Sequence, residues 1–183
     1  MKIQRLSIPD VVLITPKVYG DARGYFYESF NARLFCELTG SEVAFVQDNH
    51  SRSVLGTLRG LHYQIAPHGQ GKLVRVVEGA VFDVVVDLRR SSKSFGQWTS
   101  AVLSAENQHQ LWIPQGFAHG FLTLTETAQF LYKTTDYYAP QAERCIAWND
   151  QQVGIDWPKL SVAPVLSAKD QMGATLSAAD CFE

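Results

Sequence analysis

The chain has 183 residues, of which 46% are hydrophobic and 19% charged, and its formal net charge is −2. This composition excludes a disordered chain, and the small net charge gives no general attraction to nucleic acid or to a membrane surface. We expect one domain over residues 1–183, because this length suits a single well-filled core. No apolar run is long enough to span a bilayer, and Pro9, Asp10 and Pro16 interrupt any leader-like start.

Most of the chain divides into short apolar or alternating runs that are separated by Gly, Pro, Asn and Asp, as is typical of strands. The expected strands cover residues 11–15, 25–30, 44–50, 58–64, 72–77, 80–88, 97–103, 110–113, 119–125, 129–137 and 144–148. Residues 19–24 are expected to form a turn, and Glu78-Gly79 a hairpin. Asn31 is a suitable N-cap for one helix through Leu38, with Gly40 just beyond it. The fold class expected is an all-β jelly-roll barrel with a few short helices and an irregular tail from about residue 149.

The run Leu58-Arg59-Gly60-Leu61-His62-Tyr63-Gln64 places a histidine on an apolar strand. Alternation puts Gly60, His62 and Gln64 on one face, and if that face is the inner one, Leu58 also lines the lumen. A neutral imidazole there can act as a general base near neutral pH, although most single histidines are structural. Such a base needs an orienting carboxylate, for which the residues leave several choices open: Asp83, Asp87, Asp136, Asp156 and Asp170.

Two spacings resemble the sequence motifs of the cupins, a superfamily of jelly-roll barrels. Gly56 to His62 fits the start of the first motif, and Pro114-x-Gly116-x-x-His119 fits the second. The chain then departs from metal-binding cupins, because Gln64 stands where they have a second histidine. Their glutamate is replaced by a cluster around Gln70, Lys72 and Arg75. Two histidines and an amide beside an ammonium group are a poor metal site, so we expect no metal.

Six segments in order resemble the dTDP-4-dehydrorhamnose 3,5-epimerases, a family within the cupins. The matching segments are Arg23-Gly-Tyr-Phe-Tyr-Glu28, Gln47-Asp-Asn49, Leu58 to Gln64, Lys72-Leu-Val-Arg-Val76, Pro114 to Phe121 and Leu166-Ser-Ala-Lys-Asp170. The resemblance implies an isomerase of dTDP-L-rhamnose biosynthesis, and so of carbohydrate production such as lipopolysaccharide O-antigen. Its substrate would be dTDP-4-dehydro-6-deoxy-D-glucose (the 4-keto-6-deoxyglucose nucleotide), inverted at C3 and C5 through enolates.

The resemblance also implies a role for four residues in this reaction. His62 corresponds to the base, oriented by Asp170. Lys72 corresponds to the stabiliser of the enolate, and Tyr132 to the acid on the opposite face of the sugar. The chemistry requires no cofactor, which agrees with the broken metal motif and with the lack of a dinucleotide-binding fingerprint.

The nucleotide half of the substrate needs further groups. Arg23 and Arg59 suit the diphosphate, because a guanidinium matches phosphate oxygens. The other substrate-binding residues implied are Phe26, Glu28, Gln47, Asn49, His119, Tyr138, Glu143 and Lys169. The family resemblance further implies a homodimer in which N-terminal strands cross to the partner. We expect a cytoplasmic location, since Cys36, Cys145 and Cys181 form no C-x-x-C pattern and suit a reducing compartment.

Three alternatives remain open at this point. One is an epimerase of C3 or C5 alone, or a 3,4-ketoisomerase, on the same type of nucleotide sugar. Another is a metal-dependent cupin oxygenase that uses His62, His119 and Gln64. The third is a module that binds a nucleotide sugar without catalysis, which the set of His62, Lys72, Tyr132 and Asp170 argues against, because binding alone does not need it.

Overall fold

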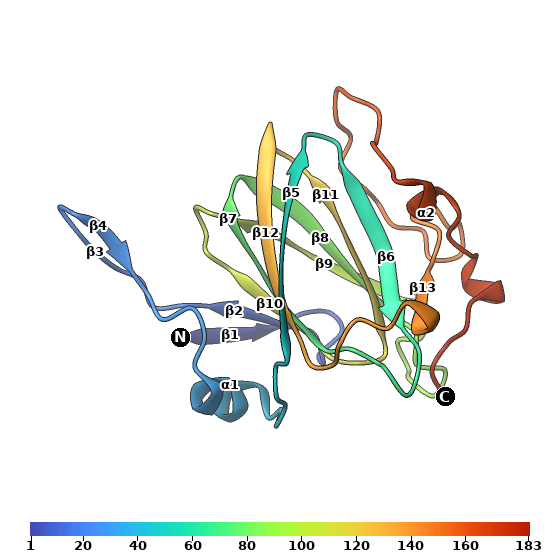
Figure 1. Cartoon of the computed structure of the whole chain (residues 1–183), viewed down its shortest axis with the longest axis horizontal. Coiled ribbons are helices and arrows are strands. Elements are labelled where there is room, and N and C mark those ends of the chain that lie inside the picture. The colour runs from blue at the N-terminus through green and yellow to red at the C-terminus, as the bar shows by residue number, and fades with distance from the viewer.

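The computed structural model describes all residues, 1–183, and consists mainly of two antiparallel sheets that face each other (Figure 1). The first sheet has six strands in the order β1 (Lys2–Arg5), β2 (Val12–Thr15), β10 (Gln110–Ile113), β7 (Lys72–Glu78), β12 (Thr127–Thr134) and β5 (Gln47–Val54). The second has the order β13 (Glu143–Cys145), β6 (Leu58–Gln64), β11 (Phe117–Thr123), β8 (Ala80–Asp87) and β9 (Trp98–Ser104). The all-β class predicted from the sequence is confirmed.

Three apolar clusters hold the layers together, and the third lies between the helix that precedes β5 and the six-stranded sheet. The central cluster lies between the sheets, where Val74 and Phe130 of the first sheet meet Val85 and Phe121 of the second. A second cluster covers the outer face of the five-stranded sheet with residues of the C-terminal tail, among them Leu176. The strands of the five-stranded sheet bury apolar side chains on both faces, because the first sheet covers one face and the tail covers the other. The tail is therefore part of the folded core, although it contains little regular structure.

The predicted helix is confirmed as α1 (Ala32–Thr39), on the outer side of the six-stranded sheet. The side chain of Asn31 accepts a hydrogen bond of 3.1 Å from the Leu34 N–H, and Gly40 ends the helix with a φ of 73°. Phe35 packs edge-on against Trp112 of β10, with ring centroids 5.1 Å apart. Three shorter helical segments complete the secondary structure: η1 (Pro140–Ala142), α2 (Ala168–Gln171) and η2 (Leu176–Ala178). No helix has the length and apolar character that crossing a membrane requires.

The structure corrects the hairpin expected at Glu78-Gly79. The two strands on either side of this turn, β7 and β8, belong to different sheets and do not pair with each other. Gly79 has a φ of 71°, so a turn is present as predicted. The same turn chemistry serves a hairpin and a corner between two sheets, and only the pairing of the distant strands distinguishes them.

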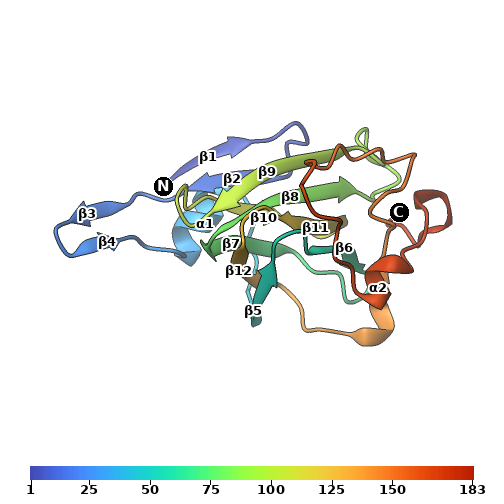
Figure 2. The same ribbon diagram turned by 90° about the horizontal axis from the view of Figure 1, so that it is seen from above.

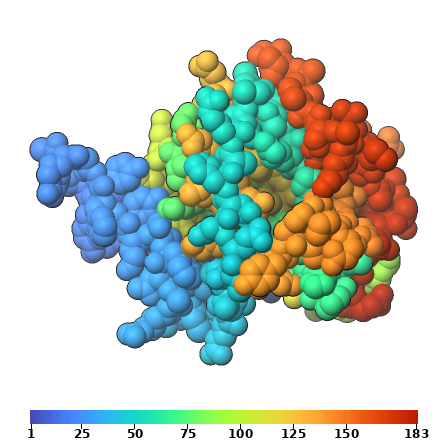
Figure 3. All heavy atoms as spheres, viewed as in Figure 1, coloured from blue at the N-terminus to red at the C-terminus, as the bar shows by residue number.

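The N-terminal aromatic segment also differs from the prediction. Residues 19–24 were expected to be a turn and 25–30 a strand, but a short hairpin forms from β3 (Tyr19–Asp21) and β4 (Gly24–Phe26). This hairpin projects away from the two main sheets in both ribbon views and in the space-filling view (Figures 1, 2 and 3). Tyr25 is 65% exposed and Phe26 71%. Such large exposed aromatic side chains mark a surface for contact with another molecule.

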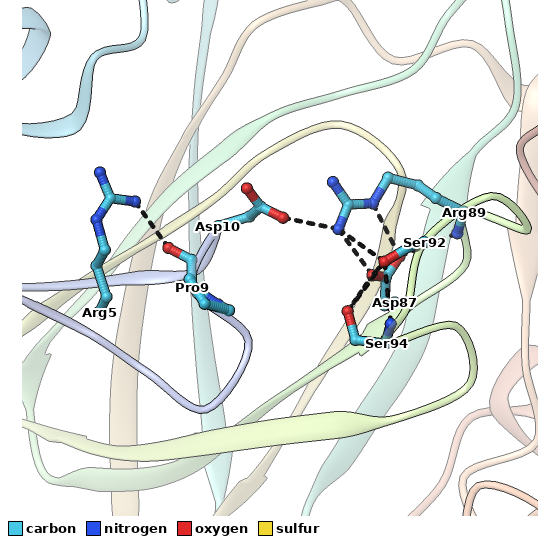
Figure 4. Close-up of polar contacts among 7 residues, drawn as sticks. All are labelled: Arg5, Pro9, Asp10, Asp87, Arg89, Ser92 and Ser94. Carbon is cyan, nitrogen blue, oxygen red and sulfur yellow. Dashed lines mark hydrogen bonds and ion pairs between the residues drawn. The ribbon is translucent and has the colours of Figure 1, made fainter.

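A polar network fixes the loop that follows β8 (Figure 4). The buried carboxylate of Asp87 accepts hydrogen bonds from the Arg89 guanidinium at 2.7 and 2.9 Å and from the hydroxyls of Ser92 and Ser94 at 2.6 and 2.7 Å. Arg89 also donates to Asp10 at 2.8 Å, which joins this loop to the turn between β1 and β2. Both oxygens of Asp87 are thus engaged in the scaffold, and it does not orient His62.

Candidate active site

A cavity of about 190 Å³ opens between the two sheets, on the face that Figure 3 shows hollowed beside β5 and the segment near residue 140. Seven of the predicted site residues, six of them on strands of the main sheets, share this cavity with polar and aromatic neighbours. Its lining consists of Ser51, Arg59, His62, Tyr63, Gln64, Gln70, Lys72, His119, Phe121, Phe130, Tyr132, Tyr138 and Glu143. A mixed lining with several convergent ionisable groups is typical of a catalytic pocket.

An irregularity in β6 decides which of its side chains enter the cavity. His62 pairs with His119 and Arg59 with Phe121, so that Gly60 and Leu61 together oppose the single residue Gly120. This β-bulge re-aims the side chains beside it. Arg59 and His62 therefore both line the cavity, whereas Leu58 lies in an outer apolar groove. The prediction that Leu58 lines the lumen was wrong, because alternation was assumed to continue through the bulge.

The bulge requires glycine on both strands. Gly60 has a φ of +125°, and a Cβ on it would lie 2.6 Å from the Cα of Gly120. A Cβ on Gly120 would in turn lie 2.6 Å from the Arg59 carbonyl oxygen. The two backbones thus approach too closely for any side chain, and the glycines allow this approach.

His62 lies beside Asp170 of α2. The Nε2 atom of His62 is 2.8 Å from Oδ1 of Asp170, although the contact is bent and Nε2 makes no hydrogen bond of regular geometry. The other ring nitrogen, Nδ1, has no partner in the chain. Burial lowers the pKa of His62, as does the nearby Lys72, and Asp170 only partly opposes them. The imidazole is therefore neutral at neutral pH and can accept a proton.

Asp170 is held rigidly at the start of the tail helix. It is 3% exposed and accepts hydrogen bonds from the Gly60 N–H at 3.1 Å and the Ser167 hydroxyl at 2.6 Å. Burial raises the pKa of its carboxyl, but the bonds from Ser167 and Gly60 and the nearby His62 outweigh burial and lower the pKa overall. The bulge glycine that turns β6 thus also anchors the carboxylate beside His62. Of the five carboxylates open in the sequence, this is the one that the structure brings to His62.

Lys72 enters the cavity from β7 and is 8% exposed. Its Nζ donates a hydrogen bond of 3.2 Å to the His62 carbonyl oxygen. Burial lowers the pKa of Lys72 to about 8, against the attraction of Asp83 and Glu143. An ammonium group with so few partners in a buried site is available to an anionic ligand atom.

His119 lies opposite His62 in the strand ladder, and its Nε2 is 2.9 Å from the buried carboxylate of Asp83. The imidazole also stacks on Phe130, with centroids 6.0 Å apart. Burial raises the pKa of Asp83, while His119 and Lys72 act in the opposite direction. Asp83 thus fixes His119 on the cavity floor, although the sequence had offered Asp83 as one of the carboxylates that could orient His62.

Tyr132 comes from β12, on the sheet opposite His62. Its ring packs near Phe130, with centroids 6.1 Å apart, and its hydroxyl has no hydrogen-bond partner in the chain. Burial raises the pKa of Tyr132, and Arg59 only partly opposes this. The hydroxyl is therefore protonated and free to donate.

Three of the predicted nucleotide-binding residues meet at the rim of the cavity. Glu143 accepts hydrogen bonds from the Tyr138 hydroxyl at 2.8 Å and from Lys169 at 2.5 Å. Its pKa is raised by burial, but Lys169 and Tyr138 outweigh burial and lower it overall. Gln47 of β5 accepts from the Tyr138 N–H at 3.1 Å and donates to Asn49 at 2.9 Å, so these residues extend the polar rim along β5.

Arg23, Phe26 and Glu28 do not reach this cavity within the chain. Arg23 forms an ion pair with Asp21 on the projecting hairpin, and Glu28 accepts from Asn31 at 2.9 Å. The structure therefore divides the predicted site into one group around the cavity and another group on or beside the hairpin.

Sequence reasoning missed two residues around the pair of His62 and Asp170. Ser167 caps α2 and bonds to Asp170 in a reciprocal capping box, and its spacing of three residues from an acid was a usable signal. Cys145 of β13 lies directly opposite His62, and burial beside Asp170 raises its pKa to about 12. No sequence signal placed Cys145 there, because the contact depends on strand pairing.

Comparison with known proteins shows the family to which the chain belongs. Residues 5–178 match the family model described as dTDP-4-dehydrorhamnose 3,5-epimerase. The chain belongs to this family. It is 62% identical over 182 residues to the dTDP-4-dehydrorhamnose 3,5-epimerase of Pseudomonas aeruginosa, covering 100% of this chain and 99% of the relative. Membership makes it an isomerase, as the sequence motifs predicted.

Solved structures of related epimerases have the same fold. A dTDP-6-deoxy-D-glucose-3,5-epimerase from Legionella pneumophila, in complex with dTDP-4-keto-L-rhamnose, matches with a TM-score of 0.95 and 51% identity. That match covers 98% of this chain and 94% of the other. A 3′-monoepimerase from Streptomyces bikiniensis, in complex with dTDP-quinovose, matches with a TM-score of 0.89 and 35% identity over 95% of this chain and 87% of the other. The predicted cupin-type epimerase fold is confirmed.

Proposed function

We propose that the chain inverts C3 and C5 of dTDP-4-dehydro-6-deoxy-D-glucose to give dTDP-4-dehydro-L-rhamnose, with His62 and Tyr132 as base and acid. The observation that carries this assignment is their position on opposite sheets, facing one cavity. A sugar ring bound between the sheets would present one face to each group. Inversion requires that a proton leave one face and return to the other, so a single group cannot complete it.

Removal of a proton from C3 or C5 gives an enolate with negative charge on the C4 oxygen. Lys72 is the buried cation of the cavity floor, and a fixed positive charge stabilises a developing oxyanion strongly in such a water-poor site. Asp170 holds the imidazole by its Nε2 side, which leaves Nδ1 as the atom that takes the proton. The neutral phenol of Tyr132 then supplies a proton from the opposite sheet.

The nucleotide is assigned to the rim. Arg59 suits the diphosphate, while Gln47, Asn49, Tyr138, Glu143 and Lys169 provide polar and aromatic contacts, and His119 contacts the sugar. Bound dTDP-sugars in two of the similar structures support a substrate of this class. The substrate is thus a small nucleotide sugar, and we assign the chain no nucleic-acid partner.

We propose a homodimer in which the β3–β4 hairpin brings Arg23, Phe26 and Glu28 to the partner's cavity. The support is the exposure of the hairpin aromatics, the projection of the hairpin away from the main sheets (Figure 1) and the absence of these three residues from the lining of the cavity. A cytoplasmic location is supported by three cysteines that are all free.

We assign no cofactor to the reaction. The oxygenase alternative would need His62, His119 and Gln64 as metal ligands, but two of these have other partners. The Gln64 carbonyl oxygen accepts from the Ala139 N–H at 2.9 Å, and His119 Nε2 contacts Asp83. Two of the three donors of that set are therefore engaged by the scaffold.

The test of the function is proton NMR of the 4-keto sugar nucleotide in D₂O with chelator-treated protein. We expect deuterium at both C3 and C5 and formation of the inverted product. Exchange at one carbon only would support the single-site alternative. One of the similar structures, the 3′-monoepimerase, is an enzyme of that kind. No exchange without a divalent metal would refute the cofactor-free assignment.

The rate should depend on pH through His62 and Lys72. The base must be neutral, and burial lowers the pKa of His62, so activity should fall only below its ordinary pKa of about 6.5. The cation must be charged, and the pKa of Lys72 is about 8, so kcat/KM should fall above that pH. In Lys72→Arg the side chain stays charged, so the residual activity should not decline there. An unchanged alkaline limb in this variant would contradict the assignment to Lys72.

A further inference from the structure

His62, Asp170 and Cys145 form a cluster on the side of the imidazole that faces away from the substrate cavity. A ring nitrogen of His62, Sγ of Cys145 and a carboxylate oxygen of Asp170 all lie within 4.8 Å of one another, and Nε2 is the nitrogen 2.8 Å from Asp170. We propose that this cluster is an inhibitory binding site for Zn²⁺ or a similar soft divalent ion. The site is distinct from the metal position of cupins, since it uses neither His119 nor Gln64.

The three donors are those that zinc prefers. A nitrogen, a sulfur and a carboxylate oxygen match its usual ligand set, while magnesium and calcium require oxygen ligands. The buried carboxylate of Asp170 and a thiolate of Cys145 together would balance the charge of the ion. A water molecule would complete the four-coordinate shell.

Outside the cluster, Nε2 of His62 and the Cys145 thiol have few competing partners. Nε2 of His62 is buried without a hydrogen bond of regular geometry. The Cys145 thiol donates one weak hydrogen bond of 3.5 Å to the Ile146 carbonyl oxygen. Oδ1 of Asp170 keeps its bond from the Gly60 N–H, which fixes the carboxylate as a rigid ligand. Nε2 of His62 lies 2.8 Å from Oδ1 of Asp170, so its close polar contact is with another member of the cluster.

The geometry needs only small adjustments. Ligand atoms around a tetrahedral zinc ion lie roughly 3.3 to 3.7 Å apart. The cluster must therefore contract by roughly 1 Å at its widest, and Nε2 of His62 and Oδ1 of Asp170, now 2.8 Å apart, must separate by roughly 0.5 Å. Cys145 and His62 are opposite residues of paired strands, which keeps both side chains at the same level of the sheet. Rotation of the thiol and of the imidazole suffices for the contraction.

Binding would stop epimerisation through the imidazole, and this consequence rests on the proposed role of His62. The metal takes the lone pair of Nε2, so the ring proton moves to Nδ1, the atom assigned as the base. The S–H bond of Cys145 breaks as the zinc–sulfur bond forms, and one proton leaves to solvent with no change of oxidation state. Nδ1 then carries a hydrogen and cannot accept one from C3 or C5.

The experiment uses the full chain, stripped with a chelator and dialysed. Added Co²⁺ should produce a thiolate-to-cobalt charge-transfer band in the near ultraviolet, which Zn²⁺ should abolish. Micromolar Zn²⁺ should lower C3 and C5 exchange by roughly tenfold or more, and a chelator should restore it. Magnesium at the same concentration should leave exchange unchanged.

The deciding variant is Cys145→Ser, which keeps the size of the side chain and removes the sulfur. It should lose the cobalt band and need roughly tenfold more Zn²⁺ for the same inhibition, with exchange intact in metal-free buffer. Cys181→Ser, which alters a thiol outside the cluster, should behave like the parent chain. Equal inhibition of the parent and Cys145→Ser, or no cobalt band in the parent, would overturn the site. A Cys145-dependent band without inhibition would instead refute the role of His62 and leave the metal site standing.

Discussion

Replacement of His62 by alanine should abolish proton exchange at both C3 and C5. The variant removes the one neutral imidazole of the cavity whose cavity-facing nitrogen has no protein partner. General-base catalysis contributes up to about 10⁴-fold, so exchange should fall by about that factor. The readout is the rate of deuterium incorporation at each carbon by proton NMR.

Binding of dTDP should be largely unchanged in the same variant, because the nucleotide is assigned to the rim and the hairpin. Calorimetry with dTDP therefore separates a lost base from a misfolded site. Asp170→Asn is the matched control for orientation, since it keeps the size of the side chain and removes the charge beside Nε2. Its defect should not add to that of His62→Ala in the double variant, because the two residues act as one unit. Additive losses, or full exchange in His62→Ala, would contradict the base assignment.

The two-sheet fold could be predicted from the sequence because its signals are local. Strand periodicity, the Asn31 cap and Gly40 describe single segments. The helix and most of the expected strands were confirmed, whereas the strand expected over residues 25–30 was not. The pairing of segments was harder to predict. Glu78-Gly79 has the composition of a hairpin turn but joins two sheets, because distant strands compete for each edge.

The sequence predicted which residues belong to the candidate site, but not how their side chains are arranged around it. Alternation in β6 fails at Gly60, and this places Arg59 rather than Leu58 in the cavity. The choice of Asp170 among five carboxylates came from the family resemblance, since no periodicity links residue 170 to residue 62. The contact arises because the tail pairs with the edge of the chain at the start of β6, where the Leu58 N–H donates to the Val165 carbonyl oxygen at 3.0 Å.

Tyr132→Phe should separate proton removal from inversion. The variant keeps the ring that packs near Phe130 and removes a hydroxyl without a partner in the chain, so the fold should be unaffected. His62 and Lys72 remain, so the enolate still forms and deuterium from solvent still enters from the His62 face.

Loss of the acid removes the proton source on the opposite face, and product formation at one carbon or both should fall by about 10²- to 10⁴-fold. The expected spectrum in D₂O is therefore that of a substrate which gains deuterium but keeps its configuration. Such uncoupling distinguishes a two-sided mechanism from one in which His62 both removes and returns the proton. A variant that forms the inverted product at the parent rate would show that another group on the six-stranded sheet, or water, is the acid.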